Sequence, residues 1–320
     1  MSVNAEIEQR RMAATLIGGV AVLLWALLAL FTTYAAGIPP FQLLGMAFTI
    51  AFLLAMVFWI ARGGLAALER LRQPAGAWML GVGGLFGYHF FYFLALGNAP
   101  PVEASLIAYL WPLLIVLFSA LLPAERLRWF HLAGALLGLI GAALLVTEGR
   151  AFSFKAEFAL GYLAAAACAL TWSVYSVMNR RYGAVPTDVV GGFCGATAVL
   201  GVFAHLVFEE TVIPDTTQWL AALALGLGPV GAAFFFWDYG TKHGHIQALG
   251  ASAYAAPLVS TILLVVFGKA TASWSLWVAC LLIVAGAALA SKELLLGRRR
   301  ALPPAPPAEA ANQTGSDIRP

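Results

Sequence analysis

The sequence predicts an all-α integral membrane protein with ten transmembrane helices, arranged as two inverted five-helix repeats. Three observations predict this fold: the apolar composition, the distribution of basic residues, and an internal repeat. Hydrophobic residues make up 62% of the 320-residue chain, charged residues make up only 10%, and the mean hydropathy is +0.87. Soluble domains carry about a quarter charged residues. The apolar runs here are about twenty residues long, the length of helix that crosses a bilayer.

Polar breaks that contain proline, glycine and charged residues separate the apolar runs. The first run follows a short polar segment and is longer than the core of a cleavable signal peptide, so we expect it to remain as the first transmembrane helix. Cys168, Cys194 and Cys280 lie inside apolar runs at wide spacing, so they predict neither a metal site nor a cofactor. The ten predicted spans cover residues 12–34, 39–61, 75–97, 103–122, 131–147, 158–180, 186–208, 217–241, 246–268 and 274–296.

Basic residues fall almost entirely on one side of these spans. Of the 18 Lys and Arg residues, only Arg150, Lys155 and Lys269 lie in the loops opposite the termini. Because cytoplasmic loops carry an excess of Lys and Arg, this asymmetry predicts that both termini are cytoplasmic. An error of one span would scramble the alternation, so the asymmetry also supports the count of ten.

The second half of the chain repeats landmarks of the first. At an offset of 145 residues three pairs coincide: Tyr109 and Tyr254, Pro112 and Pro257, and Trp129 and Trp274. Nearer the start, at an offset of 147, three further pairs coincide: Trp25 and Trp172, Pro39 and Pro186, and Gly45 and Gly192. Matches of Trp, Tyr and Pro at nearly fixed offsets are harder to obtain by chance than matches of alanine, leucine or glycine. Spans one to five therefore correspond to spans six to ten.

Each half has an odd number of spans, so the two halves enter the membrane from opposite faces. Inverted repeats build many secondary transporters, whose substrate sites lie near the bilayer midplane between the repeats, often beside interrupted helices. Pro112 and Pro257 lie near the middle of equivalent spans, where proline kinks a helix. We interpret the two kinks as parts of a central cavity. The alternative is ordinary packing kinks, since proline is common in membrane helices.

This organisation divides the chain into four parts. They are a cytoplasmic N-terminal segment 1–11, a first repeat 12–148, a second repeat 149–297 and a tail 298–320. The tail is rich in proline and alanine and poor in apolar bulk, so we expect it to be disordered in the cytoplasm.

The stretch ALGNAPPVEASLIAYLWPLLIVLFSALLPAERL, residues 95–127, and its weaker second copy resemble the drug/metabolite transporter superfamily, EamA type. Within it, residues 87–114 are most similar to the bacterial aromatic amino-acid exporter branch. The resemblance covers nearly the whole chain except the tail. It implies a multi-pass exporter in the bacterial inner (plasma) membrane, with a central cavity lined by helices 1, 3, 4, 6, 8 and 9. The second copy has YAAPL where the first has YLWPL, so the cavity walls are not expected to be equivalent.

Large aromatic and polar residues near mid-span are candidates to line that cavity. Trp and Tyr usually lie at the membrane interfaces, and lipid offers their polar atoms no partner at depth. Helical spacing puts Tyr88 and Tyr92 on one face, and Trp172, Tyr175 and Asn179 on another. For any one of these rings, simple filling of the core is the alternative. The predicted substrate-binding residues are Trp25, Tyr88, His89, Tyr92, Tyr109, Trp111, Pro112, Trp172, Tyr175, Asn179, Phe235, Tyr254 and Pro257.

Two ionisable residues at depth are functional candidates. His89 is expected to be neutral, and it either contacts substrate or has a structural role. Asp238 either couples transport to protons or pairs with Lys242, four residues later. No catalytic residue is predicted, because a membrane-embedded enzyme would need a nucleophile with a base, or a metal cluster, converging at depth.

The leading functional prediction is a secondary exporter of aromatic and other neutral amino acids, working by alternating access. An exporter of hydrophobic drugs or aromatic cations would use the same rings through stacking and cation–π contacts. The sequence has no P-loop pattern for ATP and no mid-membrane cluster of Lys or Arg for phosphate-bearing substrates. The expected partners are the lipid bilayer and the small-molecule substrate, without nucleic acid or an obligate protein partner.

Overall fold

The computed structural model describes residues 3–123, 125–151 and 153–295, and the tail 298–320 lies outside them. The helices of the first half are α1 Val3–Trp25, α2 Leu28–Tyr34, α3 Pro40–Gly63, α4 Ala75–Asn98, α5 Pro101–Ala108, α6 Trp111–Phe118 and α7 Trp129–Thr147. Those of the second half are α8 Ala159–Met178, α9 Val190–Phe208, α10 Thr216–Leu227, α11 Ala233–His243, α12 Ile246–Ser252, α13 Ala255–Val266, α14 Trp274–Ala290 and α15 Lys292–Leu295.

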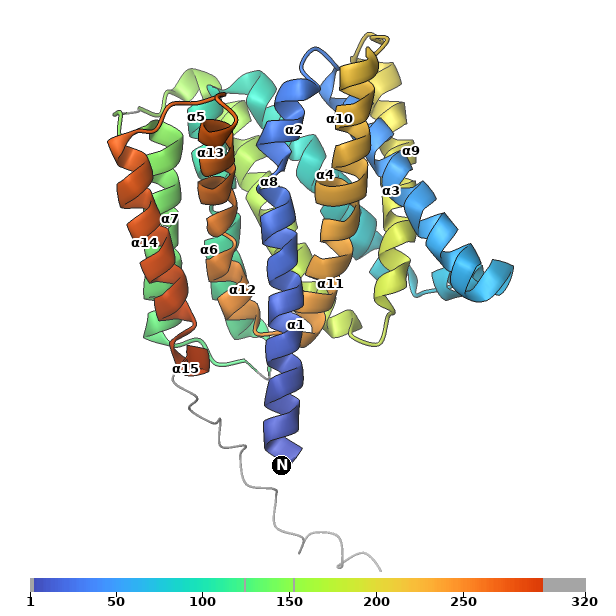
Figure 1. The fold of residues 1–320 in the computed structure, drawn as a ribbon, viewed down its shortest axis with the longest axis horizontal. Coiled ribbons are helices and arrows are strands. Elements are labelled where there is room, and N and C mark those ends of the chain that lie inside the picture. The colour runs from blue at the N-terminus through green and yellow to red at the C-terminus, as the bar shows by residue number, and fades with distance from the viewer. Residues whose placement is uncertain (1–2, 124, 152, 296–320) are drawn as a thin grey trace, which may run out of the picture.

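The helices stand side by side in one bundle, with the start of α1 and the short α15 at the same end (Figure 1). Within the described residues, nine helical stretches are long and apolar enough to cross a membrane, and α14 is a shorter tenth of 17 residues. The ten predicted spans are therefore confirmed as helices. α1 begins at Val3 rather than at residue 12, because no helix breaker precedes the apolar run and Glu6 pairs with Arg10 one turn later, at 2.8 Å.

The packing follows a twofold exchange of the two halves. The most extensive helix contacts are α1 with α11, α4 with α8, α3 with α9, and α7 with α14. Exchanging each span for its equivalent five spans later turns the α1–α11 pair into the α8–α4 pair and leaves the other two pairs unchanged. An odd number of spans in each half reverses the chain direction, so equivalent helices run in opposite senses. The predicted inverted repeats are confirmed by this packing.

Glycines set the separation of the paired helices. A Cβ on Gly240 of α11 would lie 2.5 Å from the Cα of Gly18 in α1. A Cβ on Gly286 of α14 would lie 2.5 Å from the carbonyl oxygen of Gly134 in α7. No side chain fits at these distances, so small residues allow the backbones to touch, as is common between membrane helices.

Four of the spans are interrupted. The fourth breaks between α5 and α6, just before Pro112, and the ninth breaks between α12 and α13, just before Pro257. The first breaks between α1 and α2, and the eighth contains a π-helical turn, Gly228–Ala232, between α10 and α11.

The sequence predicted the interruptions at the prolines of the fourth and ninth spans, but it treated the first and eighth spans as continuous. The first span breaks without proline: the Leu27 N–H donates to the Leu24 carbonyl, 3.0 Å away and only three residues back, which tightens the last turn of α1. The π-helical turn inserts an extra residue into the eighth span, a feature that often marks functional sites.

Candidate functional site

Four tryptophans from four different spans form one group, which we call the tryptophan cluster: Trp25, Trp111, Trp172 and Trp237. Trp25 ends α1 and Trp111 begins α6, while the other two lie in α8 and α11, so each half supplies two rings. The ring centroids lie 5.0 Å apart for Trp25 and Trp237, and 5.6 Å apart for Trp25 and Trp172. These are the separations at which aromatic rings attract each other.

The cluster continues into a row of partly exposed rings on α4. The Tyr88 ring lies 5.4 Å from Trp172 and stacks on Tyr92 at 6.1 Å with an interplanar angle of 6°. Tyr88, Tyr92 and Trp25 are partly exposed, whereas Trp237 is fully buried. The group therefore has a packed interior and a partly exposed side.

Hydrogen bonds fix two of the four indoles. Trp25 donates from Nε1 to the Pro229 carbonyl oxygen in the π-helical turn, at 3.1 Å. Trp237 donates from Nε1 to the Ser176 hydroxyl, at 3.0 Å. Among the described residues, the indole N–H groups of Trp111 and Trp172 have no hydrogen-bond partner. Each of these two indoles therefore keeps one N–H donor that is unused in the described structure.

His89 lies beside the cluster with one ring nitrogen engaged. Its Nδ1 donates to the Leu85 carbonyl oxygen, 2.7 Å away on the same helix. Phe48 and Phe234 flank the imidazole at centroid distances of 5.4 and 6.4 Å. Because Nδ1 carries the proton, Nε2 of the neutral ring holds a lone pair that can accept a hydrogen bond.

Asp238 lies in a buried polar group rather than among the rings. Its two carboxylate oxygens are both occupied: Oδ1 accepts from Asn179 Nδ2 at 2.9 Å, and Oδ2 accepts from the Thr187 hydroxyl at 2.6 Å. Oδ2 also pairs with Lys242 Nζ at 2.9 Å, and both side chains are at least 98% buried. Of the two roles that the sequence left open, the described geometry has the pairing with Lys242. Asn179 donates to Asp238 and to the Thr241 hydroxyl, and none of its hydrogen bonds in the described residues reaches a ring of the tryptophan cluster.

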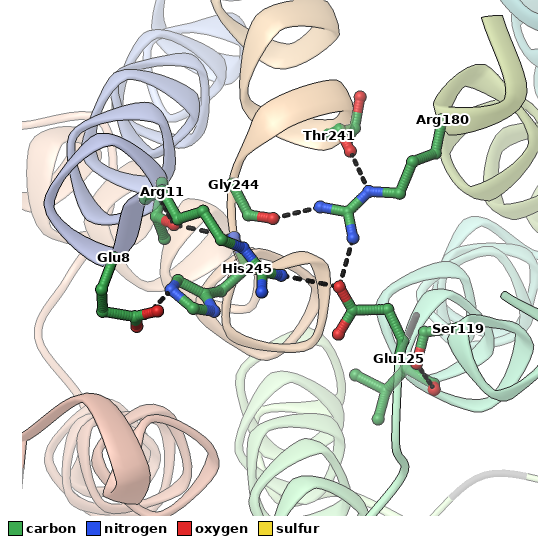
Figure 2. A network of polar contacts seen from close by, with 10 residues as sticks. Glu8, Arg11, Ser119, Glu125, Arg180, Thr241, Gly244 and His245 are labelled. Atoms are coloured by element: carbon green, nitrogen blue, oxygen red, sulfur yellow. Dashed lines mark hydrogen bonds and ion pairs between the residues drawn. The ribbon is translucent and has the colours of Figure 1, made fainter. Parts of the chain in front are cut away.

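A second ionic network joins both halves at the end of the bundle where α1 begins (Figure 2). Its centre is Glu125, whose carboxylate is 1% exposed and accepts from Arg11 of α1 at 2.7 Å. The same oxygen pairs with Arg180, which follows α8. Arg180 also donates to the carbonyl oxygens of Thr241, at 2.9 Å, and Gly244, which fastens the junction of α11 and α12.

His245 adds a further contact at the same end of the bundle. It lies in the junction between α11 and α12, and its Nε2 lies 3.0 Å from a carboxylate oxygen of Glu8 in α1. Figure 2 shows the network and this contact between converging elements of both halves.

The structure brings some of the predicted site residues together and separates others. The predicted residues that lie in or beside the cluster are Trp25, Trp111, Trp172, Tyr175, Tyr88, His89 and Tyr92. Phe235 does not join it: this ring packs on the α3 side, near Ala55 and Trp59. Successive residues point about 100° apart on a helix, so it is the neighbouring Phe234 whose ring lies 5.7 Å from Trp172.

Four predicted residues belong to the helix breaks instead. Pro112 and Pro257 are buried in the first turns of α6 and α13. Tyr254 is fully buried with Leu258, Leu276 and other residues of α7, α13 and α14, apart from the tryptophan cluster. The Tyr109 ring is partly exposed at the α5–α6 break.

Sequence reasoning missed some members of the site. Phe234 contacts three rings of the site, those of Trp25, His89 and Trp172. Pro229 supplies the carbonyl that holds Trp25. Phe234, Trp237 and Gly240 are three residues apart, so they share one face of the eighth helix, and this face is the packed one. This spacing could have indicated that Phe234, rather than Phe235, faces the site. Among the described residues, no three His, Cys, Asp or Glu side chains gather closely enough to hold a metal ion.

Comparison with known proteins gives a consistent result. Residues 12–147 and 159–292, one stretch in each half, match the EamA-like transporter family. An aromatic amino acid exporter of Ancylobacter novellus is 56% identical over 290 residues, which cover 90% of this chain and 99% of that protein. One of Escherichia coli K12 is 26% identical over 87% of this chain and 97% of its own length.

A solved crystal structure is also similar to this chain. It is 55% identical in sequence, with a TM-score of 0.84 over 90% of this chain and all of its own chain. The two matched stretches coincide with the two halves of the fold. The chain belongs to the EamA-like transporter family.

Proposed function

We propose that this protein exports aromatic and other neutral amino acids across the bacterial inner membrane by alternating access. Relatives that are 56% and 26% identical over most of their length carry the name aromatic amino acid exporter. In the proposed orientation both termini are cytoplasmic, as the distribution of Lys and Arg predicts.

One observation carries the proposal: each half of the inverted repeat contributes two rings to the tryptophan cluster. Substrate sites of such transporters lie where the two repeats meet. An aromatic side chain would stack on these rings, which present large apolar faces and few charges.

The polar groups around the cluster suit the two ends of an amino acid. A carboxylate would accept from the indole N–H groups of Trp111 and Trp172, which are free of other partners in the described residues. The ammonium group would donate to Nε2 of His89, whose other nitrogen is held by Leu85. This assignment keeps Trp25, Tyr88, His89, Trp111 and Trp172 as proposed substrate contacts.

The ionic network around Glu125 would close the cytoplasmic end in the described conformation. It ties α1 and the end of the fourth span to Arg180 and the α11–α12 junction, which belong to the other half. Opening that end requires the Glu125 contacts to separate. The Asp238–Lys242 pair is fully satisfied, which favours export without proton coupling through Asp238.

The test is transport by the purified protein in proteoliposomes, one amino acid at a time, with and without a pH gradient. We expect tryptophan and phenylalanine to move down their gradients without a pH gradient. His89→Ala and Trp111→Ala should reduce this movement at least tenfold while the protein remains folded and membrane-inserted. Movement of permanent aromatic cations but not of amino acids would replace the proposal with drug export. Movement only with a pH gradient would establish proton coupling instead.

A further inference from the structure

The hydroxyl of Tyr254 is inserted into the backbone of a helix that belongs to the other half of the protein. The Leu113 N–H donates to the Tyr254 Oη at 3.2 Å, and the same hydroxyl donates to the Tyr109 carbonyl oxygen at 3.1 Å. Leu113 is four residues after Tyr109, so in an uninterrupted α-helix these two groups would bond to each other. In the described structure they do not, and the phenol occupies the gap.

Two features make this insertion specific. Pro112 removes the neighbouring backbone donor, so the gap lies where the helix is already weakened. Tyr254 has 0% exposed surface, so the two hydrogen bonds are what allows its hydroxyl to be buried here.

The Tyr254 ring is held in place by the fifth and tenth spans. It packs beside Ala142, Leu276 and Ile283. Gly138 of α7 provides the space, since a Cβ at that position would lie 2.9 Å from Cγ of the ring.

The segment that follows the gap carries two functional elements. Trp111 begins α6 and contacts three other tryptophans. Beyond α6 the chain reaches Glu125, the centre of the ionic network. A change at the α5–α6 gap would therefore move a ring of the proposed substrate site and the residue that fastens the proposed cytoplasmic closure.

We propose that Tyr254 is a positioning residue for transport: its hydroxyl holds the α5–α6 gap and thereby sets the place of Trp111. The inference rests on the proposed function but extends it, because it assigns Tyr254 a role through the backbone rather than in contact with substrate. When the hydroxyl leaves, Leu113 and Tyr109 can bond directly, and the helix then has a second, straighter arrangement.

The first measurement is transport kinetics of Tyr254→Phe, which keeps the ring and removes only the hydroxyl. We expect the maximal rate of tryptophan export, divided by KM, to fall at least fivefold. Thr261→Val is the matched control, because it removes a hydroxyl from the same ninth span. Among the described residues, Thr261 bonds only within α13, to the Pro257 carbonyl at 2.9 Å. This control should transport like the wild type.

A double-variant comparison separates positioning from general weakening. Because Tyr254 is inferred to act through Trp111, Tyr254→Phe should have less than a twofold effect when Trp111 is already replaced by phenylalanine. Equal losses in both backgrounds, or wild-type kinetics for Tyr254→Phe, would overturn the inference. Failure of the wild type to move tryptophan would count against the proposed function instead.

A spectroscopic readout tests the inference without any substrate. Near-ultraviolet circular dichroism at the long-wavelength edge, where only tryptophan absorbs, reports the coupling between the closely spaced indoles. Tyr254→Phe should change this signal and Thr261→Val should not. An unchanged signal in Tyr254→Phe would also refute the positioning role.

Discussion

The two proline-broken spans are equivalent by sequence, yet they are held in different ways. In the first half, the gap between α5 and α6 contains a hydroxyl from the other repeat, and α6 leads to a buried glutamate held by two arginines. In the second half, α13 leads to a run of exposed residues that includes Lys269. The comparison teaches that duplicated helices can keep the same interruption while only one of the two gaps is bridged by a side chain of the other half.

One residue pair accounts for much of this difference. At the repeat offset of 145, Gly138 of the first half corresponds to Ile283 of the second. Gly138 leaves room for the Tyr254 ring, whereas Ile283 is 99% buried and fills its own position with side chain. Tyr109, the equivalent of Tyr254, is partly exposed, and its hydroxyl has no partner among the described residues.

The largest effect is expected when the first half is given the residue of the second. Gly138→Ile would push the Tyr254 ring out of its place, so export should fall more than tenfold. Overpacking should also lower the free energy of unfolding by about 3 kcal/mol. Proteoliposome transport and thermal unfolding in detergent would measure both. The control is Gly83→Ile on α4, where a Cβ meets no atom within 4 Å. Its stability should stay within about 0.5 kcal/mol of the wild type, and a loss equal to that of Gly138→Ile would contradict the interpretation.

An intermediate effect on stability is expected from substitutions just beyond the ends of the fourth and ninth spans. Glu125→Gln removes the charge that two arginines share, and should lower the free energy of unfolding by about 2 kcal/mol. Lys269→Gln removes a cation that lies over the exposed Tyr34 ring at 5.0 Å, so it should change stability by less than about 1 kcal/mol. Denaturant titration of the two variants compares them directly. Equal losses would mean that both spans are anchored alike.

The smallest difference is expected between the two tyrosine hydroxyls. Tyr254→Phe leaves a buried backbone donor and acceptor without their shared partner, unless the helix closes on itself, so the loss should be about 1 kcal/mol. Tyr109→Phe removes a hydroxyl that has no partner in the described structure, and the change should be within about 0.5 kcal/mol. Unfolding in matched detergent would detect the difference. A larger loss of unfolding free energy for Tyr109→Phe than for Tyr254→Phe would contradict the conclusion that the Tyr254 hydroxyl is the one that bridges the two halves.

The sequence was sufficient to predict the outline of the fold. Apolar runs of bilayer length and matched Trp, Tyr and Pro residues predicted the ten helices and two repeats, because both signals depend on local composition and order. The breaks at Pro112 and Pro257 followed from the chemistry of proline. No residue type marks the break after Trp25, whereas the π-helical turn contains Pro229, a mid-span proline that the sequence-based prediction did not use.

The candidate site was predicted only in part. Depth in the membrane selected Trp25, Trp111 and Trp172, which the structure brings into contact. Depth alone could not distinguish Phe234 from Phe235, because that choice depends on the rotation of the eighth helix. It also could not place Tyr254, whose hydroxyl finds its partners on a helix 145 positions earlier in the chain.

The shared hydrogen bonds at the α5–α6 gap have a consequence for how such a molecule can be built from copies of itself. In a dimer of two identical five-helix chains, each chain would have to supply the inserting phenol and also receive one, and position 138 would have to be small in both. A single fused chain is free of that requirement: one half can specialise as donor and the other as recipient. Joining the two halves in one chain allows equivalent positions to carry different residues, which two identical chains cannot do.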